Sequence, residues 1–289
     1  MKQIHRKAMA KINLGLDVVG KRPDGYHDLR MIMQTVNLYD RVKLSMTRSP
    51  GVRVKTNLRF LPTDRANHAY QAAQMLMEEF GIKEGAFIEL EKHIPVAAGL
   101  AGGSSDAAAV LEGMNLLFDL GLSQEELRER GVKIGADVPY CILGGTALAE
   151  GIGERLTSLP RIPDCSIVIA KPDVRVSTKY VYTHLVLDDQ TLHPQIDAQI
   201  DAIRCGDLKA MSSLCGNVLE SVTIPAHPQI ARLKEEMLEG GALTAMMSGS
   251  GPSVFGIFED RDRAQAVFSA MRERKDGTQA YLTVPCYPG

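Results

Sequence analysis

The sequence predicts an α+β protein built from two domains. The chain has 289 residues, which is enough for two hydrophobic cores. A Gly-rich turn joins a strand to a helix near the middle of the chain, and the elements of the second half follow a βαββαβ order. Pro160 and Pro163 interrupt the chain between these features. We therefore expect domains over residues 1–160 and 161–289.

Composition narrows the class of protein. Hydrophobic residues make up 45% and charged residues 24% of the chain, as in water-soluble globular proteins. The net charge of −2 argues against a general nucleic-acid or membrane-surface binder, and no apolar run reaches the roughly 18 residues of a membrane-spanning helix. The five cysteines are scattered without a Cys-x-x-Cys pair, which indicates reduced thiols in the cytoplasm.

The chain opens with an alternating segment over residues 7–19, which predicts a strand. Lys11 and Asn13 fall on its polar face, which is either the wall of a cleft or a solvated sheet surface. The elements expected next are a turn at residues 22–25, strands over 27–37, 40–47 and 52–56, and a helix over 69–81.

The Gly-rich turn follows an apolar strand over residues 86–94 and opens a helix at about Ser104, with Ser104 or Ser105 as the cap. Glycines let a ligand approach the backbone, and a helix N-terminus attracts anions, so the turn suits a phosphate. No Lys follows the glycines, which excludes the common G-x-x-x-x-G-K-[ST] loop. A turn without any ligand stays an alternative.

Asp137 marks a second point of interest. A helix capped by Ser123 is expected to end near residues 133–135, and Pro139 disfavours helical angles at Val138. Asp137 therefore lies at a sharp break, where its side chain either projects into a cleft or caps a turn. A strand over residues 144–150 follows.

The second half reads as a ferredoxin-like βαββαβ sandwich with extra helices in the middle. Its expected elements are strands over 166–170, 243–247, 253–259 and 280–285, and helices over 228–238 and 261–274. Between the two central strands lies a second Gly-rich turn, at residues 248–252. This turn can approach a ligand closely or be an ordinary hairpin turn.

Three segments in this order, Ala10–Leu14, Pro95–Ala109 and Met247–Pro252, resemble the GHMP kinases over essentially the whole chain. Arg22–His27 and Gly135–Pro139 narrow the resemblance further. The chain is most similar to members that use ATP to phosphorylate the 2-hydroxyl of cytidine-diphosphate-linked methylerythritol, in the non-mevalonate route to isoprenoids.

The resemblance implies a two-domain GHMP kinase fold. Its N-terminal domain contains a left-handed βαβ unit, its C-terminal domain is ferredoxin-like, and the active site lies in the cleft between them. It also implies ATP and Mg²⁺ as cofactors. The Mg²⁺ ligands are unassigned, and the chemistry of its hydroxyl makes Ser105 a candidate. A small-molecule substrate, a cytoplasmic location, and a monomer or weak homodimer without nucleic-acid or membrane partners complete the expectation.

The resemblance further implies roles for individual residues. Lys11 and Asp137 are the catalytic pair. The residues implied to bind ATP are Asn67, Lys92, Pro95, Val96, Ala97, Ala98, Gly99, Leu100, Ala101, Gly102, Gly103, Ser104 and Ser105. The residues implied to bind the substrate are Asn13, Tyr26, His27, Thr178 and Tyr182, with the two tyrosines bracketing cytosine. Some relatives carry Asn at the position of Asp106, so an adenine contact by Asp106 stays open.

Three other functions remain alternatives. Another GHMP-type small-molecule kinase is disfavoured by Tyr26 and His27, because a stacking ring beside a hydrogen-bonding His suits a cytidine substrate. A non-catalytic nucleotide-binding regulator is disfavoured because both Lys11 and Asp137 are present. An RNA-binding module is disfavoured by the net charge of −2.

Overall fold

The computed structural model describes residues 2–23 and 25–288, which form two compact units. Unit 1 comprises Met1–Ala10, Leu38–Val96 and Ala101–Leu143. Unit 2 comprises Lys11–Asn37, Ala97–Leu100 and Gly144–Gly289. Both long N-terminal strands, β1 (Gln3–Lys21) and β2 (His27–Thr47), contribute residues to each unit. Because each compact unit consists of several separate segments, the units do not test the predicted domain boundary at residue 160, which stays a prediction.

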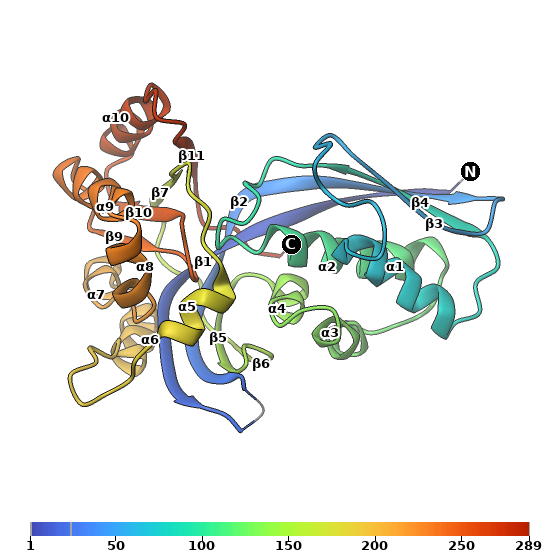
Figure 1. Cartoon of the computed structure of the whole chain (residues 1–289), viewed down its shortest axis with the longest axis horizontal. Coiled ribbons are helices and arrows are strands. Elements are labelled where there is room, and N and C mark those ends of the chain that lie inside the picture. The colour runs from blue at the N-terminus through green and yellow to red at the C-terminus, as the bar shows by residue number, and fades with distance from the viewer. Residues whose placement is uncertain (1, 24, 289) are drawn as a thin grey trace. The chain divides into compact units, whose positions relative to one another are not determined.

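Unit 1 combines its parts of β1 and β2 with two further strands and four helices. Its further elements are β3 (Gly51–Thr56), α1 (His68–Glu79), β4 (Gly85–Glu91), α2 (Gly102–Leu117), α3 (Gln124–Val132) and α4 (Val138–Leu143). β3 and β4 are parallel and joined through α1, so they form the expected βαβ unit, whose handedness stays a prediction. β4 runs antiparallel to the second half of β2. The helices α1 and α2 lie side by side (Figure 1).

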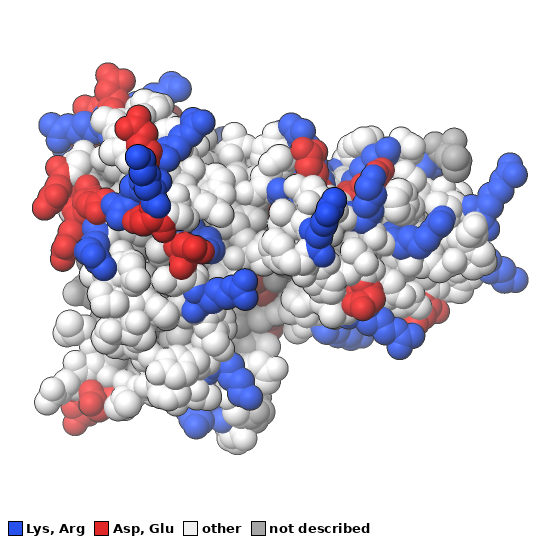
Figure 2. Space-filling view, turned by 45° about the horizontal axis from the view of Figure 1, so that its top comes forward, with Lys and Arg blue, Asp and Glu red and all other residues white. Residues whose placement is uncertain are grey.

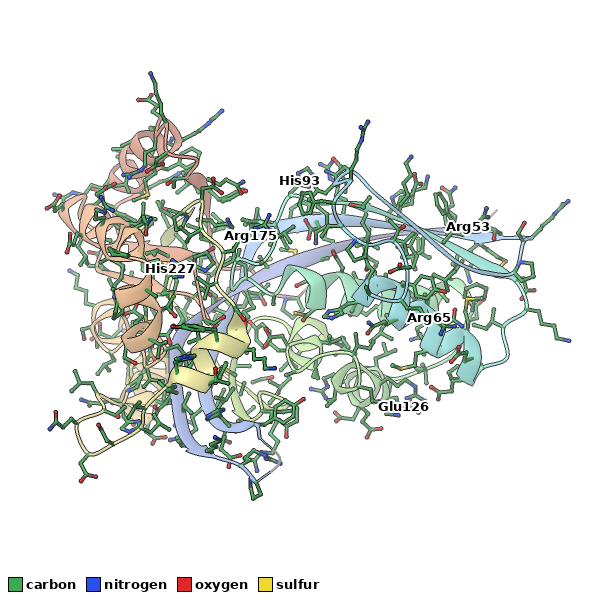
Figure 3. All side chains as sticks on the ribbon, viewed as in Figure 1. Arg53, Arg65, His93, Glu126, Arg175 and His227 are labelled. Atoms are coloured by element: carbon green, nitrogen blue, oxygen red, sulfur yellow. The ribbon has the colours of Figure 1, made fainter. Side chains whose placement is uncertain are left out.

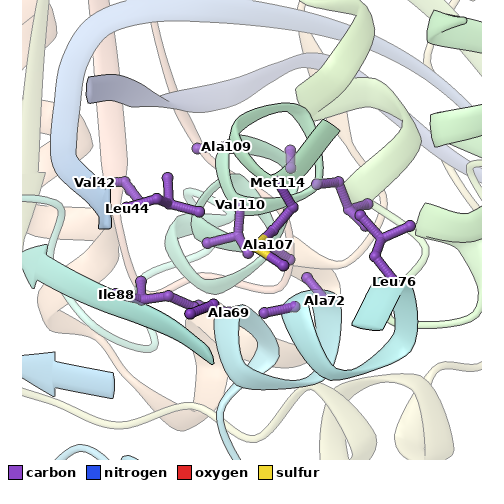
Figure 4. Close-up of a cluster of buried hydrophobic side chains, with 14 of the residues drawn as sticks. Val42, Leu44, Ala69, Ala72, Leu76, Ile88, Ala107, Ala109, Val110 and Met114 are labelled. Carbon is purple, nitrogen blue, oxygen red and sulfur yellow. The ribbon is translucent and has the colours of Figure 1, made fainter. Parts of the chain in front are cut away.

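The core of unit 1 lies between α1, α2 and the strands (Figure 4). Small residues on α2 let the helix approach β2 closely. A Cβ added at Gly113 would lie 2.5 Å from Cδ1 of Leu44, so this position has no room for a side chain. Ala107 and Ala108 are fully or almost fully buried on the same helix. Because α2 packs closely against its neighbours, the position of its N-terminal turn is fixed by the core.

Unit 2 contains the other strands and six helices. Its first elements are β5 (Thr146–Gly151), β6 (Arg155–Ser158), α5 (Thr178–His184), α6 (Ile196–Cys205), α7 (Leu208–Ser213), β8 (Gly216–Asn217) and α8 (Glu220–Ala226). β5 runs antiparallel to the first half of β2, and β8 runs parallel to β1. β2 thus changes its partner along its length, from β5 to β4.

A ferredoxin-like sheet completes unit 2. It comprises β7 (Ser166–Lys171), β9 (Thr244–Met247), β10 (Val254–Phe258) and β11 (Gln279–Thr283), with α9 (Gln229–Glu239) and α10 (Arg261–Arg272). The strand order β11-β7-β10-β9 and its antiparallel pairings confirm the predicted sandwich. Acidic and basic side chains are interspersed over α9 and α10 (Figure 2), where Arg274 binds both Glu236 and Asp276 at 2.6 Å.

Several predicted elements differ from the structure. The strands expected over 27–37 and 40–47 are one strand, β2, because the chain stays extended while it changes partner. The strand before the Gly-rich turn ends at Glu91, since the N–H group of Lys92 binds the side chain of Asn57 instead of a strand. The short elements β6, α4 and β8 were not predicted. In contrast, the predicted Ser123 cap of α3 is confirmed, and Glu126, labelled in Figure 3, completes a capping box with it.

The turn before β2 closes as predicted where it is described. The N–H group of Gly25 donates to the carbonyl of Arg22 at 3.1 Å, and Gly25 has a φ of 87°. Asp24, the other predicted turn residue, lies outside the described residues. Among the described residues, no helix has the length and apolar character needed to cross a membrane.

Candidate active site

The Gly-rich loop enters α2 through a left-handed residue. Ala101 is the N-cap with a φ of 58°, and it makes no side-chain capping bond. The prediction that Ser104 or Ser105 caps the helix is therefore wrong, because α2 already begins at Gly102 and places both serines inside it. Ser105 Oγ instead bonds the carbonyl of Met9. Without a side-chain cap, the first N–H groups of α2 can bind an anion such as a phosphate.

The middle of the loop is held by the second Gly-rich turn, within unit 2. Gly99 has a φ of 75°, and a Cβ there would lie 2.2 Å from the carbonyl oxygen of Ser248. Ser248 Oγ donates to the carbonyl of Gly99 at 3.0 Å, and the N–H group of Ser253 donates to Ala98 at 3.4 Å. The two Gly-rich segments thus pack backbone against backbone, which explains why both need residues without side chains.

Asn217 supports the second turn and was missed in the sequence. Its Nδ2 donates to the carbonyls of Met247 and Gly249, both at 2.8 Å, and its Oδ1 accepts from the N–H group of Leu219 at 3.0 Å. Asn217 belongs to β8, an element of two residues. Because such a short strand has no periodicity, no sequence pattern could single out this side chain.

Lys11 and Asn13 lie together on β1 in unit 2. Lys11 Nζ donates to Oδ1 of Asn13 at 2.8 Å, and the backbone N–H of Lys11 donates to the carbonyl of Leu100 at 3.2 Å. Both residues are buried, with exposures of 4% and 0%. This burial excludes the alternative of a solvated sheet face. Burying an ammonium group costs free energy unless its charge is paired. Buried charged groups of this kind are typical of functional sites.

Asp137 lies in unit 1, directly before the short helix α4. The expectation that Pro139 keeps Val138 out of a helix is wrong, since Val138 begins α4 and Pro139 occupies its first turn. Proline is tolerated there because a first-turn N–H has no partner within the helix. The carbonyl of Asp137 accepts from the N–H group of Cys141 at 3.0 Å, which fixes the backbone of Asp137.

Lys92 and Asn67, both implied to bind ATP, also lie in unit 1. Asn67 caps α1 by accepting from the N–H group of Ala69 at 2.9 Å. Lys92 is buried in contact with Asp40 and Asp106. Burial disfavours the charge of Lys92, but the two carboxylates outweigh it and raise its pKa. Burial raises the pKa of Asp106 to about 7, opposed by Lys92 and reinforced by Asp40.

The predicted substrate residues all belong to unit 2. His27 packs on Tyr182, with 5.3 Å between ring centroids and a tilt of 35°. Burial, and then the charge of Lys21, lower the pKa of His27. Thr178 Oγ1 and Ser250 Oγ are 2.9 Å apart. Tyr26 is 60% exposed, so its ring can receive a ligand.

No group of three or more His, Cys, Asp or Glu residues that could hold a metal ion occurs in the described part of the chain. Ser105, the candidate Mg²⁺ ligand, is 1% exposed. Its hydroxyl proton is directed at the carbonyl of Met9, and its oxygen also lies 3.3 Å from Sγ of Cys141. A metal-binding role of Ser105 stays a prediction.

Replacing Gly103 by Val is expected to weaken ATP binding by more than ~10-fold while the protein stays folded. A Cβ at Gly103 would meet only Nδ1 of His68, at an ordinary 3.5 Å, so a Cβ atom itself causes no clash with the fold. The added methyl groups would nevertheless cover the first N–H groups of α2. Calorimetry measures the affinity. Gly20→Val is the control, because nothing lies within 4 Å of a Cβ there. Unchanged ATP affinity in folded Gly103→Val would refute the phosphate site.

Comparisons with known proteins identify similar chains. Family models described as the GHMP kinases N terminal domain and the GHMP kinases C terminal match residues 67–145 and 199–277. A "4-diphosphocytidyl-2-C-methyl-D-erythritol kinase" of Lachnoclostridium phytofermentans is 56% identical over 97% of this chain and 96% of its own. The protein of the same name from Geobacillus kaustophilus is 51% identical over 92% of both chains.

Two solved structures of kinases are also similar to this chain. A crystal structure of a 4-(cytidine 5'-diphospho)-2C-methyl-D-erythritol kinase matches with a TM-score of 0.84 and 34% identity, over 99% of this chain and 100% of that one. A homoserine kinase from Cytophaga hutchinsonii matches with a TM-score of 0.80 over 99% and 96% of the two chains, at 23% identity. The second match shows the fold alone.

Proposed function

This chain belongs to the GHMP kinases, and within them to the 4-diphosphocytidyl-2-C-methyl-D-erythritol kinases. We therefore propose that it transfers the γ-phosphate of ATP to the 2-hydroxyl of 4-diphosphocytidyl-2-C-methyl-D-erythritol. The reaction belongs to the non-mevalonate route to isoprenoid precursors. The observation that carries the proposal is 56% identity over 97% of the chain to a kinase of this name.

The function is tested by a phosphate-transfer assay with ATP and a panel of acceptors. The panel contains free methylerythritol, its cytidine-diphosphate conjugate, mevalonate and homoserine. Transfer to the conjugate alone supports the proposal. Preferred transfer to mevalonate or homoserine would assign the chain to another GHMP kinase, and no transfer to any acceptor would favour a non-catalytic nucleotide-binding protein.

The Gly-rich loop is the proposed site for the phosphates of ATP. The uncapped start of α2 presents N–H groups that fit a phosphate chain, and Gly99–Ser105 supply the backbone around it. Asn67 and Lys92 are proposed to lie on the nucleotide side, which the family resemblance supports. Ser105 is the candidate residue to hold Mg²⁺, which would supply positive charge to offset the negative charge of the phosphates. We infer action in the cytoplasm as a monomer or weak homodimer.

Lys11 and Asp137 are the proposed catalytic pair. The Asp137 carboxylate accepts the proton of the 2-hydroxyl as the oxygen attacks the γ-phosphorus, while the bond from this phosphorus to the β–γ bridging oxygen breaks and ADP leaves. The Lys11 ammonium, oriented by Asn13 at 2.8 Å, offsets the negative charge that develops on the transferred phosphoryl group. Phosphoryl transfer needs such positioning and charge stabilisation more than covalent participation of the protein.

Tyr26, His27, Thr178 and Tyr182 are the proposed cytidine-binding residues. His27 and Tyr182 already form one aromatic pair, and the exposed ring of Tyr26 lies next to His27 in sequence. Cytosine would stack on the tyrosine rings, while the neutral form of His27, favoured by its lowered pKa, keeps one ring nitrogen as an acceptor.

Replacing Tyr26 by Ala is expected to raise the Michaelis constant for the cytidine conjugate by ~5- to 150-fold, because stacking on one ring contributes about 1–3 kcal/mol. The KM for ATP should not change. Steady-state kinetics with both substrates measures this. Tyr180→Ala is the control, since Tyr180 is also exposed, at 48%, but is not a predicted substrate residue. An unchanged KM for the conjugate would remove Tyr26 from the proposed site.

A further inference from the structure

A buried cluster of three charged side chains lies at the start of α2. Lys92 Nζ contacts Oδ2 of Asp40 and Oδ2 of Asp106, and the exposures of these side chains are 4%, 0% and 6%. The three residues come from different elements of unit 1: Asp40 from β2, Lys92 from the segment after β4, and Asp106 from α2. We call them the Lys92 cluster.

The Lys92 cluster binds the backbone on both sides of the Gly-rich loop. Before the loop, Asp40 Oδ1 accepts from the N–H groups of His93 and Ile94, the latter at 2.8 Å. Figure 3 labels His93, which follows β4. After the loop, Lys92 Nζ donates to the carbonyl of Gly102 at 3.4 Å. The loop residues 95–101 therefore begin and end at backbone that is tied to the same three side chains.

Lys92 has no hydrogen-bond donor to spare. A lysine ammonium group carries three N–H donors. Its three acceptors are Asp40, Asp106 and the carbonyl of Gly102. A nucleotide base could bind Lys92 only by displacing one of these acceptors. Displacing a carboxylate would leave a buried charge without its partner, which is strongly unfavourable.

We propose that Asp40, Lys92 and Asp106 position the Gly-rich loop for the phosphates of ATP, and that Lys92 acts through this loop without touching the base. The proposal rests on the proposed function in naming ATP as the ligand. It makes these three residues positioning residues. The backbone N–H groups of the loop bind the phosphates, and the cluster holds that backbone in the binding geometry.

The test compares ATP with inorganic tripolyphosphate, which has a phosphate chain but no base. For Lys92→Met in the full chain, we expect the dissociation constants of both ligands to rise by the same factor, about 10- to 100-fold, because displaced N–H groups lose their bonds to either ligand. The KM for the cytidine conjugate should change by less than about 3-fold. Calorimetry, steady-state kinetics and thermal unfolding provide these measurements.

Lys43→Met is the matched control. Lys43 on β2 also joins that strand to β4, through Glu89 at 3.2 Å, but its side chain is 36% exposed. The substitution is the same and also removes an ion pair of unit 1, while the loop is untouched. We expect unchanged affinity for both ATP and tripolyphosphate in this variant.

A second pair of variants decides the question if Lys92→Met does not fold. Asp106→Ala removes an acceptor of Lys92 and should lower the affinity for both ATP and tripolyphosphate. Asp106→Asn keeps an amide oxygen in place and should restore the affinity. A lower affinity for ATP with an unchanged affinity for tripolyphosphate would overturn the proposal in favour of a contact between Lys92 and the base. Unchanged affinity for both in a folded Lys92 or Asp106→Ala variant would overturn it as well. If the unsubstituted protein bound neither ligand, the proposed function itself would fail.

Discussion

Replacing Asp137 by Asn is expected to lower turnover by ~10²–10⁴-fold, the range typical of losing a positioned base. Asparagine has the shape of aspartate but cannot take up the hydroxyl proton. The backbone of Asp137 is fixed by the N–H group of Cys141 at 3.0 Å, so the substitution should leave α4 in place. ATP affinity should therefore change by less than about 2-fold. Turnover with the cytidine conjugate and calorimetry with ATP measure the two quantities.

Asp119→Asn is the control for this experiment. Asp119 is also in unit 1, but its side chain is 83% exposed and pairs with Lys2 at 2.7 Å. An exposed pair contributes little, so turnover should stay at the level of the unsubstituted protein. If Asp137→Asn retained full turnover, Asp137 would have no part in the proton transfer.

Replacing Lys11 by Met is expected to lower turnover by ~10²–10³-fold through the loss of a cation beside the transferred phosphoryl group. Methionine has a similar length, so the buried space that Lys11 occupies stays filled. Asn13 loses the donor at 2.8 Å, and its amide must then find another partner. Turnover and thermal unfolding separate the catalytic effect from a loss of stability.

Lys55→Met is the matched control, since the side chain of Lys55 is 71% exposed on β3. Combining Lys11→Met with Asp137→Asn provides a further check. Two groups that act on the same step should give a double variant little slower than the slower single variant. Multiplicative losses would instead indicate that Lys11 and Asp137 contribute to separate steps.

Local features of the sequence determined most of the secondary structure. The periodic apolar residues of α1 and α10 predicted both helices, and Ser123 with Glu126 predicted the start of α3, because capping and periodicity involve residues only three or four positions apart. The βαββαβ order of unit 2 followed from the same local signals. The family was recognised from short motifs, since their residues are consecutive in the chain.

Only the tertiary structure decided which side chains meet across long sequence separations. Asp40 reaches Lys92 and Ile94, Ser248 reaches Gly99, and His27 reaches Tyr182. None of these contacts leaves a local pattern, because each depends on how strands and helices pack after they have formed. For the same reason, the sequence assigned Lys92 to the nucleotide but could not show that all three of its donors bind the protein.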